Sequence, residues 1–464
     1  MSKVVRREVK VLYVNGVLKW LFTGKPPSSV VSLFQRQNGG YTTKPCKYWE
    51  LKEKLELHGF LVKPLFEEEP KLSIHLKRNY ELRPYQERAV EAWLRNGVKG
   101  VVVMPSGSGK TIVGLEAIAR TKLKTLIVVP TVDLLEQWKE SISEKLSIPK
   151  EYIGVYGGGK KELGEITVTT YDSASRDVLS YGDLFGLLIA DEVHHLPAQS
   201  YRCIAEGLLA RARLGLTATP QRSDEMHVLL PSLVGPIVYE VKLKELLRKG
   251  YVAKVKEKRI YVKLPPHKEK EYERLVSIYR RYLEKQGLLD MPPLERFHEV
   301  IKKSPFDPEA RKALSAYYKA RKLALNANEK LRVLEELLEK HRREKVIIFS
   351  RYTDIVDEIS RRYLIPKITH ETPRDERAKI LEMFRRGEIT KVVTAEVLDE
   401  GVDVPDAEVA IVISGSGSPR QYIQRLGRLL RPKKREATLY ELITRETVDW
   451  LLSSKRRTLN LDTY

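Results

Sequence analysis

The sequence has little cysteine and no long apolar run. Its 464 residues include two cysteines, Cys46 and Cys203, which lie far apart and outside any C-x-x-C pair. Two such residues cannot build a disulfide framework, and by themselves they cannot hold zinc or an iron–sulfur cluster. No segment approaches the roughly 20 apolar residues that a membrane span needs, and the N-terminal stretch MSKVVRREVKVLYV lacks the apolar region of a signal peptide. These absences predict a cytoplasmic protein with no membrane partner.

Positive charge, by contrast, is in clear excess. The chain has 83 Lys and Arg residues against 62 Asp and Glu, which gives a formal net charge of +21. An excess of this size favours a polyanionic partner, and nucleic acid is the first candidate. A membrane surface and simple solubility are the alternatives that charge alone leaves open.

The pattern of apolar residues divides the chain into three regions. Residues 1–72 alternate in polarity around Asn15-Gly16, a signal for a tight hairpin, and then become helical, so a small α+β domain is expected. Residues 73–245 and 246–464 each alternate short apolar strands with helices, which is typical of a parallel sheet covered on both faces. A helical insertion at about 265–320 interrupts the last region. The predicted fold class is α/β, with two tandem lobes.

The stretch VVVMPSGSGKT at residues 101–111 has the features of a phosphate-binding loop. An apolar strand leads into a glycine-rich turn and a helix, so backbone N–H groups at the helix start can face an anion. Gly107 and Gly109 would let the backbone approach the phosphates. Lys110 would reach the β- and γ-phosphates, and the Thr111 hydroxyl would bind Mg²⁺.

One residue of this stretch departs from the standard pattern G-x-x-x-x-G-K-[ST]. Met104 stands where the first glycine is usual. It occupies the last strand position, which takes least part in holding phosphate, so we expect a working loop. A chance G-K-T at a helix start is the alternative.

An acidic pair supplies the second half of a nucleotide site. Asp191 and Glu192 follow the apolar run of LFGLLIADEVHH, so they emerge at the carboxyl edge of the sheet, beside the loop. Asp191 would bind Mg²⁺, and Glu192 would act as the general base on the attacking water. In the second lobe, QYIQRLGRLLRP places Gln424, Arg428 and Arg431 on one helix face, where an arginine could reach a γ-phosphate. A solvated or phosphodiester-binding basic helix is the alternative there.

The ordered set PYQ, GSGKT, PT, TYDS, DEVH, TAT, TAEVLDEGVDVP and QRLGRLLR resembles the motor core of superfamily 2 helicases and translocases, across residues 82–432. LRPYQ, VVPTVDLLEQWK, DEVHHLPAQSYR, LGLTATPQRSDE and ITHETPRDER extend the resemblance to the XPB family, in its short archaeal form. The resemblance implies two RecA-like lobes, a damage-recognition domain in residues 1–72 and a DNA-gripping thumb in the insertion. It also implies an ATP- and Mg²⁺-dependent 3′ to 5′ DNA motor in excision repair or transcription initiation, with a nuclease as a candidate partner.

The resemblance also implies roles for individual residues. Those implied to act in catalysis are Lys110, Asp191, Glu192, Arg428 and Arg431. Those implied to bind the nucleotide are Arg83, Gln86, Ser106, Gly107, Ser108, Gly109, Lys110, Thr111, Gly401 and Asp403. Those implied to couple hydrolysis to motion are His194, Thr217, Ala218, Thr219 and Gln424. Those implied to hold nucleic-acid backbone are Pro130, Thr131, Thr170 and Thr394.

The chain departs from the family at one element. Members have Arg-Glu-Asp just after TAT, an element implicated in separating the strands, and here the matching residues are Arg222, Ser223 and Asp224. Because the middle acid is missing, a duplex translocase that does not separate strands stays open. An RNA helicase and an inactive basic scaffold stay open as well.

Overall fold

The computed structural model describes residues 7–37, 40–222, 224–251, 255–395, 407–414 and 437–455. Between Glu245 and Leu246 the chain divides into two compact units, which are described separately. Gly401, Asp403, Gln424, Arg428, Arg431 and Ser223, all predicted site residues, lie outside the described residues.

The first unit begins with a five-stranded sheet in the order β3-β4-β2-β1-β5. β1 and β2 form the hairpin predicted at Asn15-Gly16, since Val14 pairs with Val17 and both turn residues have positive φ, 46° and 78°. Such a two-residue turn matches the twist of the strands. Helix α2 packs Tyr48, Leu51 and Leu55 into the small core. The elements are β1 (Arg7–Val14), β2 (Val17–Phe22), α1 (Ser28–Val31), β3 (Gln35–Gln37), β4 (Gly40–Thr43), α2 (Tyr48–Leu57) and β5 (Phe60–Pro64).

The rest of the first unit is an eight-stranded sheet in the order β13-β6-β12-β11-β7-β10-β8-β9. All neighbouring strands are parallel except β8 and β9. Every residue of β7, β8, β10 and β11 is buried, because helices cover both faces. The strands are β6 (Lys99–Val103), β7 (Thr125–Val129), β8 (Ile153–Gly157), β9 (Lys160–Glu162), β10 (Ile166–Thr170), β11 (Leu187–Asp191), β12 (Ala212–Thr217) and β13 (Ile237–Glu240).

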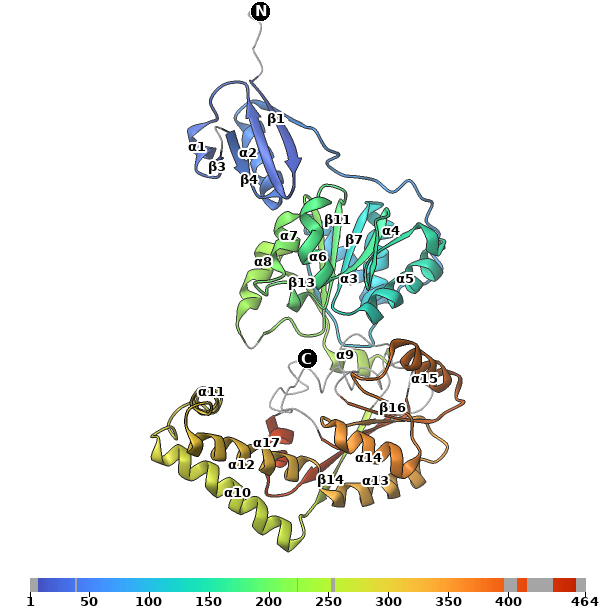
Figure 1. The fold of residues 1–464 in the computed structure, drawn as a ribbon. Helices are drawn as coiled ribbons and strands as arrows, with labels where there is room; N and C mark the ends of the chain where they lie inside the picture. The colour runs from blue at the N-terminus through green and yellow to red at the C-terminus, as the bar shows by residue number, and fades with distance from the viewer. Residues whose placement is uncertain are drawn as a thin grey trace, which may run out of the picture. The chain divides into compact units, whose positions relative to one another are not determined.

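Two groups of helices form the outer layers of this sheet (Figure 1). α3, α4 and α5 contact one another in sequence, and α6, α7 and α8 form a second contacting group. The helices are α3 (Pro84–Arg95), α4 (Lys110–Thr121), α5 (Val132–Leu146), α6 (Tyr171–Asp177), α7 (Arg202–Gly207), α8 (Leu230–Leu233) and α9 (Leu243–Arg248), the last of which crosses the division between the units.

The N-terminal module, residues 7–66, packs on the eight-stranded lobe. Leu209 of the lobe joins the module's hydrophobic core, and the Trp49 indole donates to its carbonyl over 2.9 Å. Tyr13 donates its hydroxyl to the carbonyls of Leu179 and Gly207, over 3.0 and 3.1 Å. Apolar burial and these hydrogen bonds together fix the module on the lobe.

The second unit contains a six-stranded sheet in the order β14-β19-β18-β15-β17-β16, with each described pair parallel. Its strands are β14 (Val255–Val262), β15 (Val346–Phe349), β16 (Lys367–Ile368), β17 (Lys391–Thr394), β18 (Val409–Val412) and β19 (Ala437–Thr444). Its helices are α10 (Pro266–Lys285), α11 (Pro293–Lys303), α12 (Pro308–Leu325), α13 (Asn328–Lys340), α14 (Thr353–Tyr363), α15 (Arg374–Arg386) and α17 (Val448–Lys455). The predicted fold class, parallel-sheet α/β lobes with a small α+β module, is confirmed.

Helices α10, α11 and α12 form the insertion expected near residues 265–320 and project from the second unit (Figure 1). Leu275 of α10 packs on Ala316 and Ala320 of α12, and Tyr282 lies in a cluster with Ala313. Small alanines let the two helices approach closely along one face. No helix among the described residues is both long and apolar enough to cross a membrane.

Candidate active site

The segment with the phosphate-loop pattern joins β6 to α4. Met104, where the standard pattern has glycine, is fully buried, and its N–H donates to the Thr217 carbonyl over 2.9 Å. It therefore continues the pairing of β6 with β12, and its side chain fills the core. A side chain is accommodated at this position because the turn begins only after it.

The glycines of the turn adopt backbone conformations that other residues rarely do. Gly107 has φ +77° and Gly109 has φ +86°, and Gly109 is the N-cap of α4. A Cβ atom on Gly109 would lie 2.4 Å from Nε2 of Gln86. Gly109 is therefore required both by its left-handed conformation and by the close approach of helix α3.

Helix α3 holds the loop through two side chains. Gln86, which is 3% exposed, accepts from the Arg83 backbone N–H over 2.9 Å and donates to the Ser108 carbonyl over 3.0 Å. The Tyr85 hydroxyl donates to the same carbonyl over 2.7 Å, and Arg83 donates to Tyr85. The structure thus places Gln86 against the loop and Arg83 beside Tyr85, and the nucleotide contact that the resemblance implies for both stays a prediction.

The acidic pair lies at the carboxyl end of β11. Asp191 is 6% exposed, whereas Glu192, with φ +46°, turns away from the strand. A positive φ in a glutamate is a strained conformation of the kind found at functional sites. Nζ of Lys110 lies 3.9 Å from Oε1 of Glu192 and 3.4 Å from the Met104 carbonyl oxygen. The predicted lysine, metal-binding acid and base therefore share one edge of the sheet.

The residues predicted to couple hydrolysis to motion form a chain of polar contacts from Glu192. The Thr217 hydroxyl lies 3.4 Å from Oε2 of Glu192 and 3.2 Å from Nδ1 of His194. The backbone N–H of Thr219 donates to the same hydroxyl over 3.1 Å. These contacts place the predicted coupling residues Thr217 and Thr219 next to Glu192, and their role in coupling stays a prediction.

The predicted strand-separating element joins this chain. Arg222 donates to the His194 carbonyl over 2.6 Å and makes two hydrogen bonds of 2.8 and 2.6 Å to Asp224. The adjacent guanidinium holds the pKa of the Asp224 carboxyl far below its usual range. Arg222 therefore links Asp224 to the backbone of His194, which follows the acidic pair at the carboxyl end of β11.

Of the threonines predicted to hold nucleic-acid backbone, two cap helices and one is buried in the second unit. Thr131 accepts from the Leu134 N–H over 3.3 Å at the start of α5. Thr170 accepts from the Ser173 N–H over 3.2 Å at the start of α6. Thr131 follows β7 and Thr170 ends β10, and because these strands are neighbours the two caps share one edge of the sheet. Thr394, in the second unit, is fully buried and donates to the Ala395 carbonyl.

Sequence analysis missed three aromatic residues that support the site. Tyr85 holds the Ser108 carbonyl, as described above. The Trp138 indole donates to Oδ2 of Asp191 over 2.9 Å, and the Tyr171 hydroxyl donates to the Asp191 carbonyl over 3.0 Å. In the sequence each looks like an ordinary apolar residue, because no local pattern indicates which polar atom a buried aromatic will contact.

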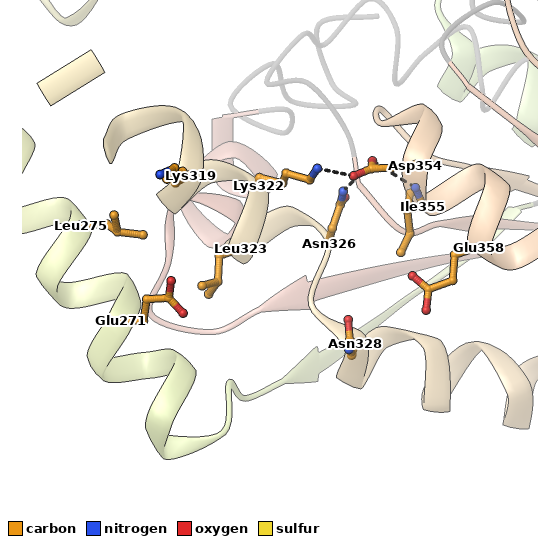
Figure 2. A pocket seen from close by; sticks show the side chains of 10 residues that line it. All are labelled: Glu271, Leu275, Lys319, Lys322, Leu323, Asn326, Asn328, Asp354, Ile355 and Glu358. Carbon is orange, nitrogen blue, oxygen red and sulfur yellow. Dashed lines mark hydrogen bonds and ion pairs between the residues drawn. The ribbon is translucent and has the colours of Figure 1, made fainter. Parts of the chain in front are cut away.

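A separate hollow lies in the second unit, at the root of the insertion. Its volume is about 390 Å³, and Figure 2 shows its lining from α10, α12, α13 and α14. The Asp354 carboxylate forms an ion pair with Nζ of Lys322 over 2.5 Å and accepts a hydrogen bond from the Asn326 amide over 3.3 Å. Glu271 and Glu358 also line the hollow. Its three carboxylates make it a poor place for a triphosphate.

The loop and acidic pair fit a nucleoside triphosphate with Mg²⁺. The first N–H groups of α4 are left without helical partners, as in every α-helix, and Lys110 adds a positive charge beside them. Mg²⁺ usually takes one or two protein oxygens and completes its shell with phosphate and water, so Asp191 and Thr111 suffice. The described residues hold no cluster of three or more His, Cys, Asp or Glu that would bind a metal unaided.

The chain matches two families and several proteins of known name. Residues 79–222 match the family described as type III restriction enzyme, res subunit, and residues 310–463 match the ERCC3/RAD25/XPB C-terminal helicase family. The DNA 3′-5′ translocase XPB2 of Sulfurisphaera tokodaii is 46% identical over 382 residues, which is 82% of this chain and 86% of that protein.

Two further similarities extend this comparison. A general transcription and DNA repair factor IIH helicase/translocase subunit XPB of Enterocytozoon bieneusi is 31% identical, over 84% of this chain and 63% of its own length. Among solved structures, the Hef helicase domain of Pyrococcus furiosus aligns with a TM-score of 0.57 at 20% identity, over 81% of this chain and 98% of that one. This last similarity concerns the fold, and it supports the RecA-like form of the two lobes.

Proposed function

This chain belongs to the XPB family of ATP-dependent DNA helicases and translocases, and we propose that it moves 3′ to 5′ along DNA by hydrolysing ATP at the β6–α4 loop. A single observation carries the assignment of the site: Lys110, Glu192 and Thr217 form a continuous polar contact beside the glycine turn, next to Asp191. Phosphoryl transfer needs a lysine and acidic groups gathered at this place, beside a loop that can bind phosphate.

In the proposed mechanism the loop binds the triphosphate. Backbone N–H groups from Gly107 to Thr111 and the Lys110 ammonium face the phosphates. Thr111 and Asp191 would hold Mg²⁺, which would neutralise charge on the β- and γ-phosphates. Glu192 orients the attacking water and accepts its proton.

In this proposal the polar contacts around Glu192 transmit the effect of ATP hydrolysis to neighbouring residues of the lobe. When Glu192 takes up a proton, its contact with Thr217 changes, and Thr217 is bonded to His194 and Thr219. Arg222, bonded to the His194 carbonyl, extends this route to the predicted strand-separating element. In the second lobe, Gly401 and Asp403 are proposed to lie near the ribose. Arg428 and Arg431 are proposed to reach the γ-phosphate on lobe closure, with Gln424 on the same helix face.

DNA is the proposed partner. The net charge of +21 favours phosphate contacts, which are sequence-tolerant. We assign damage recognition to residues 1–72, DNA grip to the insertion at 265–320, and backbone contacts to the segments beginning at Pro130-Thr131, Thr170 and Thr394. A role in excision repair or transcription initiation, and a nuclease partner, belong to the same proposal.

The experiment is steady-state ATP hydrolysis with no nucleic acid, single-stranded DNA, duplex DNA, forked DNA and RNA. Lys110→Ala and Arg431→Ala remove the proposed phosphate contacts. Arg95→Ala removes an exposed arginine in the last turn of α3, at the end of that helix away from the loop, and is the matched control for loss of one positive charge. We expect strong stimulation by DNA, retained in Arg95→Ala and lost in the other two variants.

Other outcomes would contradict defined parts of the proposal. Stimulation by RNA alone would replace the DNA motor with an RNA motor. Turnover that survives Lys110→Ala would place hydrolysis elsewhere. Stimulation by duplex DNA without displacement of a labelled strand from a fork would identify a translocase that does not separate strands, as the missing acid between Arg222 and Asp224 allows.

A further inference from the structure

The indole of Trp138 donates a hydrogen bond to a carboxylate of the proposed site. Trp138 lies in α5 and is 1% exposed, and its Nε1–H donates over 2.9 Å to Oδ2 of Asp191. The acceptor is therefore the carboxylate to which we assign Mg²⁺, which itself is almost fully buried. A hydrogen bond to an ionised group is roughly twice as strong as one between neutral groups.

The other tryptophans of the same unit donate to neutral acceptors, and Trp20 donates to the Thr43 hydroxyl over 2.9 Å. Trp93, which is fully buried in α3, donates to the Arg213 carbonyl over 2.9 Å, and Trp49 donates to the Leu209 carbonyl over the same distance. A backbone carbonyl satisfies a buried indole completely. The need of the buried indole N–H for an acceptor therefore does not by itself explain why the acceptor of Trp138 is the Asp191 carboxylate.

Both oxygens of the Asp191 carboxylate are held. While Trp138 binds Oδ2, the backbone N–H of Glu192 donates to Oδ1 over 2.9 Å. One donor from α5 and one from the adjacent backbone fix the rotation of the carboxyl plane. Each oxygen keeps a second lone pair for a metal ion or a metal-bound water.

The same indole also lies against the helix that follows the loop. A Cβ atom on Gly114 of α4 would lie 2.6 Å from Cη2 of Trp138, so the ring fits only because residue 114 is glycine. Gly114 is one turn beyond Lys110 and Thr111. Trp138 thus touches both halves of the proposed metal site, the helix that carries Thr111 and the acid at the end of β11.

We propose that Trp138 is a positioning residue that orients the Asp191 carboxylate toward Mg²⁺ and fixes its distance from the start of α4. This inference rests on the proposed nucleotide site. Groups that hydrogen-bond a metal-binding carboxylate typically contribute 10- to 100-fold to metal affinity or activity. In this proposal Trp138 contacts neither the nucleotide nor the metal. Its loss is therefore expected to reduce the effect of Mg²⁺ on nucleotide affinity and to leave nucleotide binding without metal unchanged.

The test compares ADP binding by calorimetry in EDTA and at increasing Mg²⁺. Trp138→Phe keeps an aromatic ring in the site and removes the N–H donor. Trp93→Phe removes a buried indole N–H bonded over the same distance, but to a backbone carbonyl, and it controls for lost stability. We expect Mg²⁺ to tighten ADP binding to the wild type and to Trp93→Phe. In Trp138→Phe that gain should fall by about 10-fold or more, with unchanged affinity in EDTA.

A second variant keeps the indole N–H and displaces the ring. Gly114→Ala forces the new Cβ against Cη2 of Trp138, so it should reduce the Mg²⁺-dependent gain in the same direction even if Trp138→Phe does not fold. A Mg²⁺-dependent gain equal to wild type in either folded variant overturns the positioning role while leaving the nucleotide site intact. A wild type that binds ADP equally with and without Mg²⁺ overturns the role and the proposed metal site together.

Discussion

The conformation of the loop can be tested at Gly109, where one methyl group meets two obstacles. Gly109 has φ +86°, and its Cβ position lies 2.4 Å from Nε2 of Gln86. Gly109→Ala must therefore strain the backbone and push the Gln86 amide away from the Ser108 carbonyl. Both changes act on the N-cap of α4, within the proposed phosphate-binding segment.

The magnitude follows from these two obstacles. A left-handed conformation costs a residue with a side chain about 1–2 kcal/mol. Displacing Gln86 breaks its hydrogen bonds to the Ser108 carbonyl and the Arg83 N–H, each about 1 kcal/mol net. Together these terms disfavour the loop conformation by about 3–4 kcal/mol. If ADP requires that conformation, its affinity falls by about 140- to 700-fold.

The assay is ADP binding by calorimetry, with two controls. Gly97→Ala has similar backbone strain, at φ +68°, but nothing lies within 4 Å of its Cβ position. It should lower thermal stability and leave ADP affinity unchanged. Adding Gly109→Ala to Gln86→Ala should cost only the strain, about 5- to 30-fold in affinity.

Two results would refute this reasoning. If Gly109→Ala binds ADP within about 3-fold of wild type, the loop conformation of the structure is not the one that binds nucleotide. If Gly109→Ala costs as much without the Gln86 side chain as with it, the close approach of α3 has no energetic consequence.

Three further predictions concern other parts of the molecule. In the second unit Lys330 and Asp449 form a buried ion pair of 2.7 Å, so Lys330→Met should lower the free energy of unfolding by about 3–5 kcal/mol. Urea unfolding should show Lys330→Met/Asp449→Leu to be more stable than the single variant, and a double variant that is no better would contradict the explanation. Burial and the nearby Asp183 raise the pKa of Tyr13 to about 12, and a raised pKa means that the contribution to stability is complete below pH 10 and is lost as pH rises through about 12. Fluorescence of Trp49 should therefore report loosening of the N-terminal module between pH 10 and 12, which Tyr13→Phe should abolish, and an identical transition in that variant would assign it to another group. Finally, affinity for duplex DNA should fall by orders of magnitude between about 50 and 200 mM salt if six or more phosphates are contacted, and a flat dependence would exclude a phosphate-based grip.

The sequence predicted the parts of the site that are contiguous in the chain. A phosphate loop is a strand, a turn and a helix start in succession, so Gly107, Gly109 and Lys110 could be assigned from spacing alone. Asp191 and Glu192 could be assigned because an acid after an apolar strand emerges at the carboxyl edge. The resemblance to a helicase family added Gln86 and the coupling residues, whose roles stay predictions.

The family itself and the α/β fold class were also predicted from the sequence, and the comparisons confirm them. A hydrophobic pattern with period two or near four specifies strands and helices locally. The division of labour among the domains was likewise expected from the sequence, and it stays a prediction. The positions of Arg428 and Arg431 lie outside the described residues and stay predictions as well.

Tertiary structure alone decided which distant residues meet. Trp138 and Asp191 are 53 positions apart and touch because β11 lies beside β7, the strand that leads into α5. The order of strands in a sheet depends on how whole helices and strands pack, and no local pattern records it. Tertiary structure also explains why methionine can replace the usual glycine at position 104. The Met104 backbone pairs with Thr217 and its side chain is buried in the core. Groups that are close in the sequence, such as those of the loop, can be recognised from the sequence. Contacts between distant segments depend on the free energy of packing the whole lobe.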